Sequence, residues 1–509
     1  MQNNMKKIIF GPPGTGKTTR LLNIVEEELA QGVPPDRIAY LAFTRKAAQE
    51  AVQRACNKFK IDKKDLPWFR TIHSFVFKSM NYSQDEIMKP KHYAELSDII
   101  KVPLVSVTSA DEVGVSIHNN EHLHIYDLSR ARGTTLKKEY NRFGQVDGGY
   151  EKTNYITKSL IKFKKTMHVK DYTDLLVDFC KEGFVPKLEV VIVDEAQDMS
   201  NLQWQVVDKI MAHASRVYLA GDDDQAIFDW AGADPTRLID SDWEKEVLQQ
   251  SYRIPKTAHN IADRLITRIK HRQTKLWKPR DYKGFSRSYA DRLSSDSFNK
   301  GQWLILGRTN YLLDQIEHDL RQYGHYYTRG NQPSISNKLV NAVSSWNKLR
   351  LKQEISLDDV KSIYYYMTVG QGVKRGFKGM NIQAMPGQTF SYRELREDYG
   401  LLIKNTVPWE SALDKVSSSR SIYLRTIINR DKKELTKEPR IKLSTIHGAK
   451  GGEADHVMLL TDLSRKADDS FLRNRDSERR VFYVGATRAK KSLHIIRSNS
   501  SREFTEIFQ

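Results

Sequence analysis

A glycine-rich run at residues 11–19, GPPGTGKTT, contains the residue types that hold a nucleotide phosphate. Glycines carry no Cβ, so backbone N–H groups can point at phosphate oxygens, and a lysine at this spacing reaches the β- and γ-phosphates. A hydroxyl residue directly after the lysine is a ligand for Mg²⁺. We therefore predict a nucleoside triphosphate site with Mg²⁺. Its expected nucleotide-binding residues are Gly11, Pro12, Pro13, Gly14, Thr15, Gly16, Lys17, Thr18 and Thr19, with Thr18 as a metal ligand.

The stretches on either side of this loop are typical of the elements that position such a site. Residues 6–10, KKIIF, are predicted to form a buried strand, and residues 21–29 an amphipathic helix. The glycines therefore lie at a strand-to-helix turn, which is the context that a phosphate-binding loop requires. A chance Gly/Pro turn is the alternative, and the flanking elements disfavour it. The loop alone does not distinguish kinases, AAA+ proteins, GTPases and helicases.

Two adjacent acids end a second apolar run. Residues 188–193, LEVVIV, are predicted to form a β-branched strand that leads into Asp194 and Glu195. Asp194 is expected to hold Mg²⁺ through water, and Glu195 to orient and deprotonate the water that attacks the γ-phosphate. Adjacent acids at strand ends are common by chance, but after a phosphate-binding loop the catalytic interpretation is favoured.

A third strand-like run, residues 217–220, leads into the sequence GDDDQAIFDW. A glutamine just beyond a strand end can sense a γ-phosphate, so Gln225 is a candidate for this function. Phe228 and Trp230 could stack on nucleic-acid bases. Core packing is the alternative for both aromatic residues, and for isolated residues it is the favoured one.

Composition restricts the class of protein. A chain of 509 residues suggests roughly three or four domains, and its net charge of +19 favours a polyanionic partner, nucleic acid first. Two cysteines, Cys56 and Cys180, cannot form a disulfide framework or a cysteine-rich zinc site and are typical of a reducing cytosol. No apolar run approaches the roughly 18 residues that span a membrane, and the N-terminus leads directly into the predicted strand, so neither a membrane anchor nor a secretory signal is expected.

Residues 81–170 differ from their surroundings, because strand-like runs become scarce while charged and helix-forming residues increase. This stretch is predicted to be a mostly helical insertion. Basic runs at 137–138 and 162–165 could contact a nucleic-acid backbone, and a solvated charged face is the equal alternative.

Further motifs extend along the chain. The first half carries GPPGTGKT, LAFTRKAA, TIHSF, DEAQD and GDDDQAIFDWAGA, and the second half carries QQSYRI, ILGRTN, LSTIHGAKGGEADHVMLL and ERRVFYVGATRAKKSL. In these motifs and in their order the chain resembles superfamily 1 helicases of the UvrD/Rep/PcrA type. The resemblance spans nearly the whole chain, whereas residues 81–170 and 331–435 match in position only.

The resemblance implies an α/β fold with two RecA-like P-loop motor domains, each a parallel sheet flanked by helices, and mostly helical accessory insertions. The expected bounds are 1–80 and 171–250 for the first, ATP-binding motor domain, 81–170 for an accessory insertion, 251–330 and 436–509 for the second motor domain, and 331–435 for a second, reduced insertion.

The resemblance also implies roles for residues in both halves. ATP would bind between the motor domains, and the catalytic residues would be Lys17, Glu195, Gln225, Arg253 and Arg488. Within this set Gln225 would sense the γ-phosphate, while Arg253 and Arg488 would act as arginine fingers supplied across the cleft. Tyr252 would stack on the adenine, and Glu453 would contact the ribose. The residues expected to line a single-strand track are Phe43, Thr44, His73, Phe228, Trp230 and His447.

These roles predict an ATP-dependent DNA helicase or translocase that moves 3′ to 5′ on single-stranded DNA and unwinds duplex DNA in repair, replication or recombination. The alternative is a single-strand-stimulated ATPase that remodels or strips nucleoprotein complexes without processive unwinding. A helicase–nuclease subunit and an AAA+ protein are disfavoured. The expected partners are single-stranded and partly duplex DNA, and no membrane. We expect a monomer, with self-association on DNA left open, in the cytoplasm of a bacterium or as a viral protein in its host.

Two departures from the family bear on these expectations. Relatives carry a glutamine-containing segment upstream of the phosphate-binding loop that recognises adenine, whereas only ten residues precede Gly11 and Gln2 is a poor counterpart. The preference for ATP over other nucleoside triphosphates is therefore left open. The insertion at 331–435 is shorter than in the large bacterial relatives, so translocation is favoured over duplex unwinding.

Overall fold

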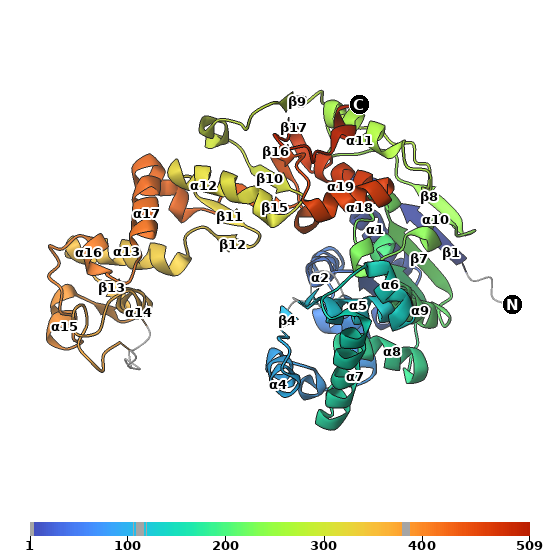
Figure 1. The fold of residues 1–509 in the computed structure, drawn as a ribbon, viewed down its shortest axis with the longest axis horizontal. Coiled ribbons are helices and arrows are strands. Elements are labelled where there is room, and N and C mark those ends of the chain that lie inside the picture. Colours follow the sequence, from blue (N-terminus) through green and yellow to red (C-terminus); the bar gives the residue numbers. More distant parts are fainter. Residues whose placement is uncertain (1–4, 105, 108–116, 119, 379–386) are drawn as a thin grey trace. The chain divides into compact units, whose positions relative to one another are not determined.

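A parallel sheet built mainly from the first half of the chain carries the predicted phosphate-binding loop (Figure 1). The computed structural model describes residues 5–104, 106–107, 117–118, 120–378 and 387–509, so Gln2 lies outside the described residues. The chain forms two units by its internal contacts. The first unit comprises residues up to 285 with 469–487 and 505–509, and the second comprises 286–468 with 488–504.

The sheet of the first unit has six strands in the order β3-β2-β6-β7-β1-β8, and its neighbouring pairs are parallel. The strands are β1 (Met5–Phe10), β2 (Ile38–Ala42), β3 (Phe69–Thr71), β6 (Val190–Val193), β7 (Arg216–Gly221) and β8 (Glu244–Val247). The register places Phe10 opposite Gly221. Because carboxyl ends of parallel strands meet at one edge, the segments that follow β1, β6 and β7 lie together there.

Both faces of this sheet are covered by helices, because successive strand residues are apolar and point to opposite sides. Ile8 and Leu41 share a core with helices α3, α8 and α9, whereas Ile9 and Tyr40 share a core with α1 and α2. The helices are α1 (Lys17–Ala30), α2 (Arg45–Phe59), α3 (Ile72–Ser79), α8 (Tyr172–Glu182), α9 (Asn201–Met211) and the short α10 (Thr236–Ile239).

The described part of residues 81–170 is mostly helical, as predicted. Its helices are α4 (Pro90–Ile100), α5 (Glu121–Arg132), α6 (Leu136–Phe143) and α7 (Gly149–Met167). Helices α4, α5 and α7 bury a small core of their own around Leu96, Leu123 and Leu160. Among the described helices, none is long and apolar enough to cross a membrane.

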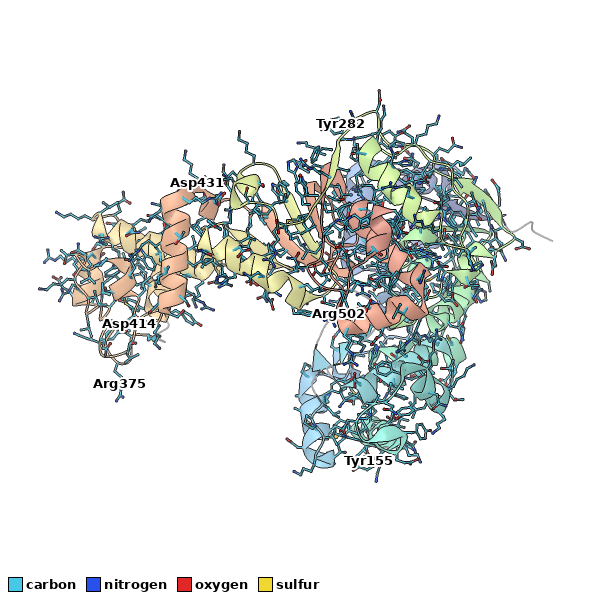
Figure 2. All side chains as sticks on the ribbon, turned by 45° about the horizontal axis from the view of Figure 1, so that its top comes forward. Tyr155, Tyr282, Arg375, Asp414, Asp431 and Arg502 are labelled. Carbon is cyan, nitrogen blue, oxygen red and sulfur yellow. The ribbon has the colours of Figure 1, made fainter. Side chains whose placement is uncertain are left out.

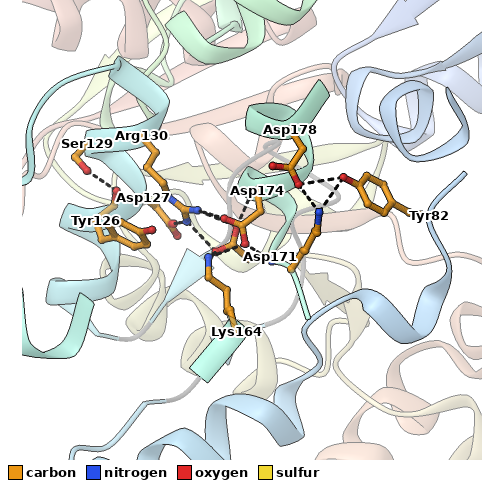
Figure 3. A network of polar contacts seen from close by, with 10 residues as sticks. Tyr82, Tyr126, Asp127, Ser129, Arg130, Lys164, Asp171, Asp174 and Asp178 are labelled. Carbon is orange, nitrogen blue, oxygen red and sulfur yellow. Dashed lines mark hydrogen bonds and ion pairs between the residues drawn. The ribbon is translucent and has the colours of Figure 1, made fainter. Parts of the chain in front are cut away.

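A buried ion-pair network joins α5, α7 and the start of α8 (Figure 3). Arg130 of α5 pairs with Asp171 and Asp174 at 2.9 Å each, and also with Asp127. Lys164 of α7 pairs with the same Asp171 and Asp174 at 2.6 Å each. Asp171 also caps α8 by accepting the Asp174 N–H at 2.8 Å. The network therefore fixes the insertion to a helix that covers the sheet.

The outward face of α7 keeps a basic character. Lys158, Lys162 and Lys165 are exposed there, and their spacing places them on the same helical face as Tyr155. Tyr155, whose ring is exposed, is labelled in Figure 2. Lys164, which was predicted to be part of the basic run, is buried because the helical period turns it toward the core of the insertion.

The second unit contains a seven-stranded sheet in the order β12-β11-β15-β10-β16-β17-β9. The pairs from β11 to β17 are parallel, and β11 pairs with β12 antiparallel. The strands are β9 (Phe285–Tyr289), β10 (Trp303–Gly307), β11 (Tyr327–Arg329), β12 (Gln332–Pro333), β15 (Ile441–Thr445), β16 (Ala454–Leu460) and β17 (Ala489–Ile496). The two parallel sheets and their helices confirm the predicted α/β class with two RecA-like domains.

The second insertion belongs to the second unit. It carries α13 (Asn337–Arg350), α14 (Leu357–Tyr365), α15 (Tyr392–Glu397), α16 (Trp409–Ala412) and α17 (Ser418–Asp431), and α12 (Asp314–Gln322) precedes it. The fully buried Trp346 of α13 donates its indole N–H to the Val407 carbonyl at 2.9 Å. Its core is continuous with that of β10 and β15.

Two segments that were predicted for the second motor domain pack in the first unit. These are residues 251–285, with α11 (Lys256–Ile266), and residues 469–487, with α19 (Arg475–Ala486). Arg480 of α19 donates to the carbonyls of Asp223 and His271 at 2.9 Å each. The first bond joins α19 to the turn after β7, and the second joins α19 to the segment 251–285, which itself contacts that turn through Arg272 and Lys275.

Candidate nucleotide-binding and nucleic-acid-binding site

The loop between β1 and α1 has the backbone of a phosphate cradle. Gly14 and Gly16 adopt φ angles of 73° and 84°, which residues with a Cβ rarely adopt. The Gly11 N–H donates to the Gly221 carbonyl at 2.9 Å and ties the loop to β7. Helix α1 begins at Lys17, so its N-terminal N–H groups are directed toward the loop. The predicted order of strand, loop and helix is confirmed.

The carboxyl end of β6 brings two carboxylates to the Lys17 ammonium. Lys17 Nζ hydrogen bonds to Glu195 and lies 3.6 Å from Asp194 Oδ1. Burial disfavours the charged ammonium, but the two carboxylates outweigh it and raise the pKa of Lys17. Burial raises the pKa of Asp194, and Lys17 opposes that rise. Tyr40 on the adjacent β2 donates its hydroxyl to Asp194 Oδ2 at 3.1 Å and so orients the carboxylate.

Glu195 is held by an uncommon backbone conformation and by one amide. Its φ is +55°, in a left-handed region that is sparsely populated by residues other than glycine and that clusters at functional sites. The buried Gln197 donates from Nε2 to Glu195 Oε2 at 2.5 Å and accepts the Asp222 N–H through Oε1 at 3.0 Å. Asp222 Oδ2 in turn accepts Gln225 Nε2 at 2.7 Å. A continuous chain of contacts therefore joins Lys17 to the predicted γ-phosphate sensor.

The residues predicted to hold Mg²⁺ fit that ion. Thr18 stands in the first turn of α1, next to Lys17, and Asp194 is buried at the end of β6. A hydroxyl and a carboxylate form an oxygen donor set, which Mg²⁺ completes with water and substrate phosphates. No cluster of three or more His, Cys, Asp or Glu side chains suited to a metal occurs in the described residues. An ion at Thr18 and Asp194 would therefore depend on the nucleotide for further ligands.

The segment Ser251–Arg253 lies directly against the phosphate-binding loop, inside the first unit. Ser251 Oγ donates to the Pro13 carbonyl and the Tyr252 N–H donates to the Gly14 carbonyl, both at 2.8 Å. A Cβ on Gly14 would overlap the Cβ of Arg253, so only glycine fits there. The Tyr252 ring is 74% exposed. Tyr252 and Arg253 thus reach the loop from within one unit, whereas Arg253 was predicted to belong to the second motor domain.

Glu453, His447 and Arg488 lie in the second unit. Arg488 Nη1 donates to the Gly452 carbonyl at 3.3 Å, next to Glu453, which itself lies 3.4 Å from Lys490 Nζ. His447 begins a short turn directly after β15. Glu453 and Arg488 therefore neighbour one another where β16 and β17 begin.

Three aromatic residues predicted to line the single-strand track form one group. The ring centroids of Phe43 and Phe228 are 5.7 Å apart and nearly parallel, and those of Phe228 and Trp230 are 6.2 Å apart and edge to face. Phe43 and Phe228 are buried, whereas Trp230 keeps 37% of its surface exposed. Phe228 is therefore packed as a core residue, and Trp230 has the most exposed side chain of the three.

Thr44 and His73, which were also predicted for the track, make structural contacts. Thr44 Oγ1 accepts the Ala47 N–H at 3.1 Å and caps α2. His73 lies edge to face with Tyr172, with 6.1 Å between ring centroids, and burial lowers the pKa of His73 to about 4. The imidazole is therefore neutral near pH 7 and supplies no positive charge for a phosphate.

Asp229 anchors the segment that carries Trp230. Its Oδ1 accepts the Trp230 N–H and its Oδ2 accepts the Ser477 hydroxyl, both at 2.8 Å. Its backbone carbonyl accepts Arg132 Nη2 at 2.7 Å. Because Ser477 belongs to α19 and Arg132 to α5, the helical insertion and α19 both hold this segment.

Gln197, Tyr40 and Ser251 are site residues that the sequence analysis did not identify. Gln197 stands inside the DEAQD motif, just after the end of a predicted strand. That position could have identified Gln197 as a site residue. Ser251 stands inside the QQSYRI motif, so that motif was an available signal, whereas Tyr40 carried none. The partners of Tyr40 and Ser251, Asp194 and Pro13, could not be identified locally because they are 154 and 238 positions away in the sequence.

Two models of known protein families match separate parts of the chain. Residues 2–246 match the family model described as the UvrD/REP helicase N-terminal domain, and residues 403–500 match the UvrD-like helicase C-terminal domain. The first match contains the phosphate-binding loop, Asp194, Glu195 and Gln225, and the second contains His447, Glu453 and Arg488.

Curated relatives match at low identity. The ATP-dependent DNA helicase PcrA of Bacillus subtilis is 24% identical over 387 residues, which cover 71% of this chain and 50% of that protein. PcrA of Staphylococcus aureus is 24% identical over 295 residues, which cover 53% of this chain and 39% of that protein. The putative ATP-dependent DNA helicase YjcD of Bacillus subtilis is 22% identical over 595 residues, covering 96% of this chain and 76% of that protein.

The chain spans half or less of the length of these PcrA relatives. The two family models nevertheless lie in the expected order, and each falls on site residues that the sequence motifs had identified. On these grounds the chain belongs to the UvrD/Rep family of superfamily 1 ATP-dependent DNA helicases.

Proposed function

We propose that the protein is an ATP-driven motor that translocates 3′ to 5′ on single-stranded DNA and unwinds duplex DNA. The observation that carries the ATP-driven part of this proposal is the chain of contacts from Lys17 through Glu195, Gln197 and Asp222 to Gln225. It gathers a phosphate-binding cation, a general base and a γ-phosphate sensor at the carboxyl edge of one sheet. The polarity and the unwinding of duplex DNA rest on the resemblance to the family. The relatives' names, which specify ATP and DNA, support both as the substrates.

The Lys17 contacts suggest how the site prepares for hydrolysis. A bound triphosphate would compete with Glu195 and Asp194 for the Lys17 ammonium. Once Lys17 turns to the phosphates, Glu195 keeps its bond to Gln197 and can accept a proton from the attacking water. Thr18 and Asp194 would hold Mg²⁺, which neutralises charge on the β- and γ-phosphates.

The remaining predicted residues complete this site. Gln225, oriented by Asp222, would contact the γ-phosphate, while Arg253 and Arg488 would neutralise charge that develops in the transition state. The exposed Tyr252 ring would stack on the adenine, and Glu453 would contact the ribose. The predicted motor-domain bounds remain part of the proposal as functional divisions, and they differ from the contact-based units, in which residues 251–285 and 469–487 group with the first sheet.

Coupling to DNA would depend on the segment that follows Gln225. Gln225 and Trp230 are five positions apart in one segment, and Asp229 ties that segment to α5 and α19. A change at the γ-phosphate would therefore shift the ring that stacks on a base. Stacking tolerates any sequence, which suits a motor that must step along every base.

ATP hydrolysis measured with single-stranded DNA, single-stranded RNA, duplex DNA and no nucleic acid tests the proposal. We expect strong stimulation by single-stranded DNA, with ATP preferred over GTP. Lys17→Ala should lose hydrolysis and retain single-strand binding. Equal turnover with and without nucleic acid would contradict the proposed coupling.

A strand-displacement assay on duplexes with a 3′ or a 5′ tail then tests polarity and unwinding. The proposal expects displacement from the 3′ tail. Removal of a protein roadblock without strand displacement would replace the helicase with the remodelling ATPase.

A further inference from the structure

Three consecutive carboxylates are buried under the turn that carries Gln225. Asp222, Asp223 and Asp224 follow β7 directly, and each has no exposed surface. Buried carboxylates require compensating charge and hydrogen bonds, because their removal from water is otherwise strongly unfavourable. The stability of this turn therefore depends on a cation that the fold places against the three carboxylates.

That cation is Lys275, whose side chain is fully buried. Its Nζ lies 3.0 Å from Asp222 Oδ1 and 2.8 Å from Asp224 Oδ2, and it also hydrogen bonds to Asp223. Burial opposes the charge of this ammonium, but the three carboxylates outweigh it and raise the pKa of Lys275. Lys275 is therefore charged in the folded protein and contacts all three acids at once.

A second cation completes the cluster. Arg272 binds Asp224 through two parallel hydrogen bonds, from Nε to Oδ1 at 2.8 Å and from Nη2 to Oδ2 at 2.5 Å. The Gln273 N–H donates to Asp223 Oδ2 at 2.9 Å. Residues 272–275 therefore hold the entire acidic turn.

Asp222 transmits this contact to the predicted γ-phosphate sensor. One of its carboxylate oxygens contacts Lys275, and the other accepts Gln225 Nε2 at 2.7 Å. Its backbone carbonyl also accepts the Gln225 N–H at 2.8 Å. Asp222 Oδ1, which contacts Lys275, also accepts the Asp224 N–H at 3.3 Å. The orientation of the Gln225 amide therefore depends on a carboxylate that Lys275 and this N–H hold together.

Helix α19 binds both the acidic turn at 222–224 and the segment that carries Arg272 and Lys275. Arg480 donates to the Asp223 carbonyl in the acidic turn and to the His271 carbonyl beside the basic segment, both at 2.9 Å. The chain passes from the first unit into the second directly after α19, between Thr487 and Arg488. The acidic turn is thus bound to the helix that leads to a proposed arginine finger.

We propose that Lys275 is a positioning residue that holds Asp222, and through it the Gln225 amide, in the orientation needed for hydrolysis. This inference rests on the proposed function, because it assigns Lys275 a role in the same ATP site. Lys275 does not touch the nucleotide. It acts by keeping three mutually repelling carboxylates in one arrangement, so its loss should reduce turnover while nucleotide binding persists.

The first test is Lys275→Met, which keeps the length of the side chain and removes its charge. We expect kcat for DNA-stimulated ATP hydrolysis to fall at least about tenfold, while the affinity for a fluorescent non-hydrolysable ATP analogue changes less than about threefold. Lys275→Arg should recover part of the loss. Lys209→Met is the matched control, because Lys209 is a half-buried lysine of the same unit that donates to the carbonyls of Phe179 and Cys180.

A charge-balanced variant separates positioning from stability. The wild-type cluster contains three carboxylates and two cations, Lys275 and Arg272. The double variant Lys275→Met with Asp223→Asn contains two carboxylates and one cation, Arg272. The net charge of the cluster is therefore the same in both proteins. This double variant should recover the wild-type circular dichroism spectrum and melting temperature, and its kcat should stay low. In addition, Lys275→Met combined with Gln225→Ala should be no slower than Gln225→Ala alone, because both act through one group.

Three outcomes overturn the proposal. These are wild-type kcat in the charge-balanced variant, additive losses with Gln225→Ala, and failure of the charge-balanced variant to fold, which would assign Lys275 to stability. Absence of DNA-stimulated hydrolysis in the wild-type protein would instead reject the proposed function, so the two failures are distinguishable.

Discussion

Gln197 Nε2 lies 2.5 Å from Glu195 Oε2, so a fully buried amide is bonded directly to the proposed general base. The other end of the same amide accepts the Asp222 N–H. This pair of bonds allows a single orientation of the amide, because the NH₂ group must face Glu195 and the oxygen must face the backbone. Gln197 therefore couples the ends of β6 and β7.

Gly221→Ala should disturb that coupling. A Cβ on Gly221 would come within 2.5 Å of Gln197 Oε1 and 3.0 Å of Leu238 Cδ2. We expect the displaced amide to lower ATP turnover at least about tenfold, and overpacking to reduce the free energy of unfolding by about 1–3 kcal/mol. Steady-state kinetics and urea unfolding measure the two effects. An unchanged kcat in Gly221→Ala would refute the coupling.

Trp230→Ala tests the proposed base-stacking ring. Loss of one stacked base costs about 1–3 kcal/mol, so single-strand affinity should weaken about 5- to 150-fold. Fluorescence anisotropy with labelled oligonucleotides measures this change, and hydrolysis without DNA should persist. Phe184→Ala is the control, because Phe184 is 72% exposed and lies outside the aromatic group. Equal affinities for the two variants would count against stacking on Trp230.

Arg130→Met should destabilise the helical insertion. The change removes the ion pair between Arg130 and Asp127, and it leaves Lys164 as the network's cation for Asp171 and Asp174. Breaking a buried ion pair by removing one partner typically costs about 3–5 kcal/mol. Hydrogen exchange should therefore accelerate in α5, α7 and the start of α8. Arg142→Met, an exposed change in the same insertion, should leave exchange unaltered, and equal protection in both variants would contradict the network's role.

Acid should destabilise the protein through His73. Burial lowers the pKa of His73 from 6.5 to about 4, so the unfolded chain binds a proton more readily than the folded chain does. The stability contributed by the neutral imidazole is complete above pH 6.5 and is lost as the pH falls toward 4. We expect the urea midpoint to decrease across this range, and less so in His73→Phe. An NMR titration of His73 with a midpoint near 6.5 would disprove the assignment.

The strand–loop–helix arrangement around Lys17 and the acids after β6 were predictable, because both follow from local patterns in the sequence. An apolar run that ends in acids places those acids at the carboxyl edge of a parallel sheet wherever the strand pairs. The tertiary partners were not predictable. Lys275 contacts Asp222 although 53 positions of sequence separate the two residues. No local pattern near either residue indicates that the other is its partner.

The affiliation of the segments at 251–285 and 469–487 could not be predicted for the same reason. Their contacts with the first sheet run through Ser251 and Arg480, whose partners are 238 and 257 positions away. Lys164 is a different case, because the helical period of the apolar residues Ile156, Leu160 and Phe163 already marked the face on which it lies.

The membership of α19 in the first unit also determines the order in which the protein can fold during synthesis. Strand β1 is translated before the second sheet, yet the helix that binds the end of β7 is translated after the second sheet's β16. The acidic turn and its neighbour α11 therefore lack their covering helix while most of the second unit is being translated. We expect nascent chains that stop before Arg475 to be recognised by chaperones, and the first unit to close only when α19 arrives.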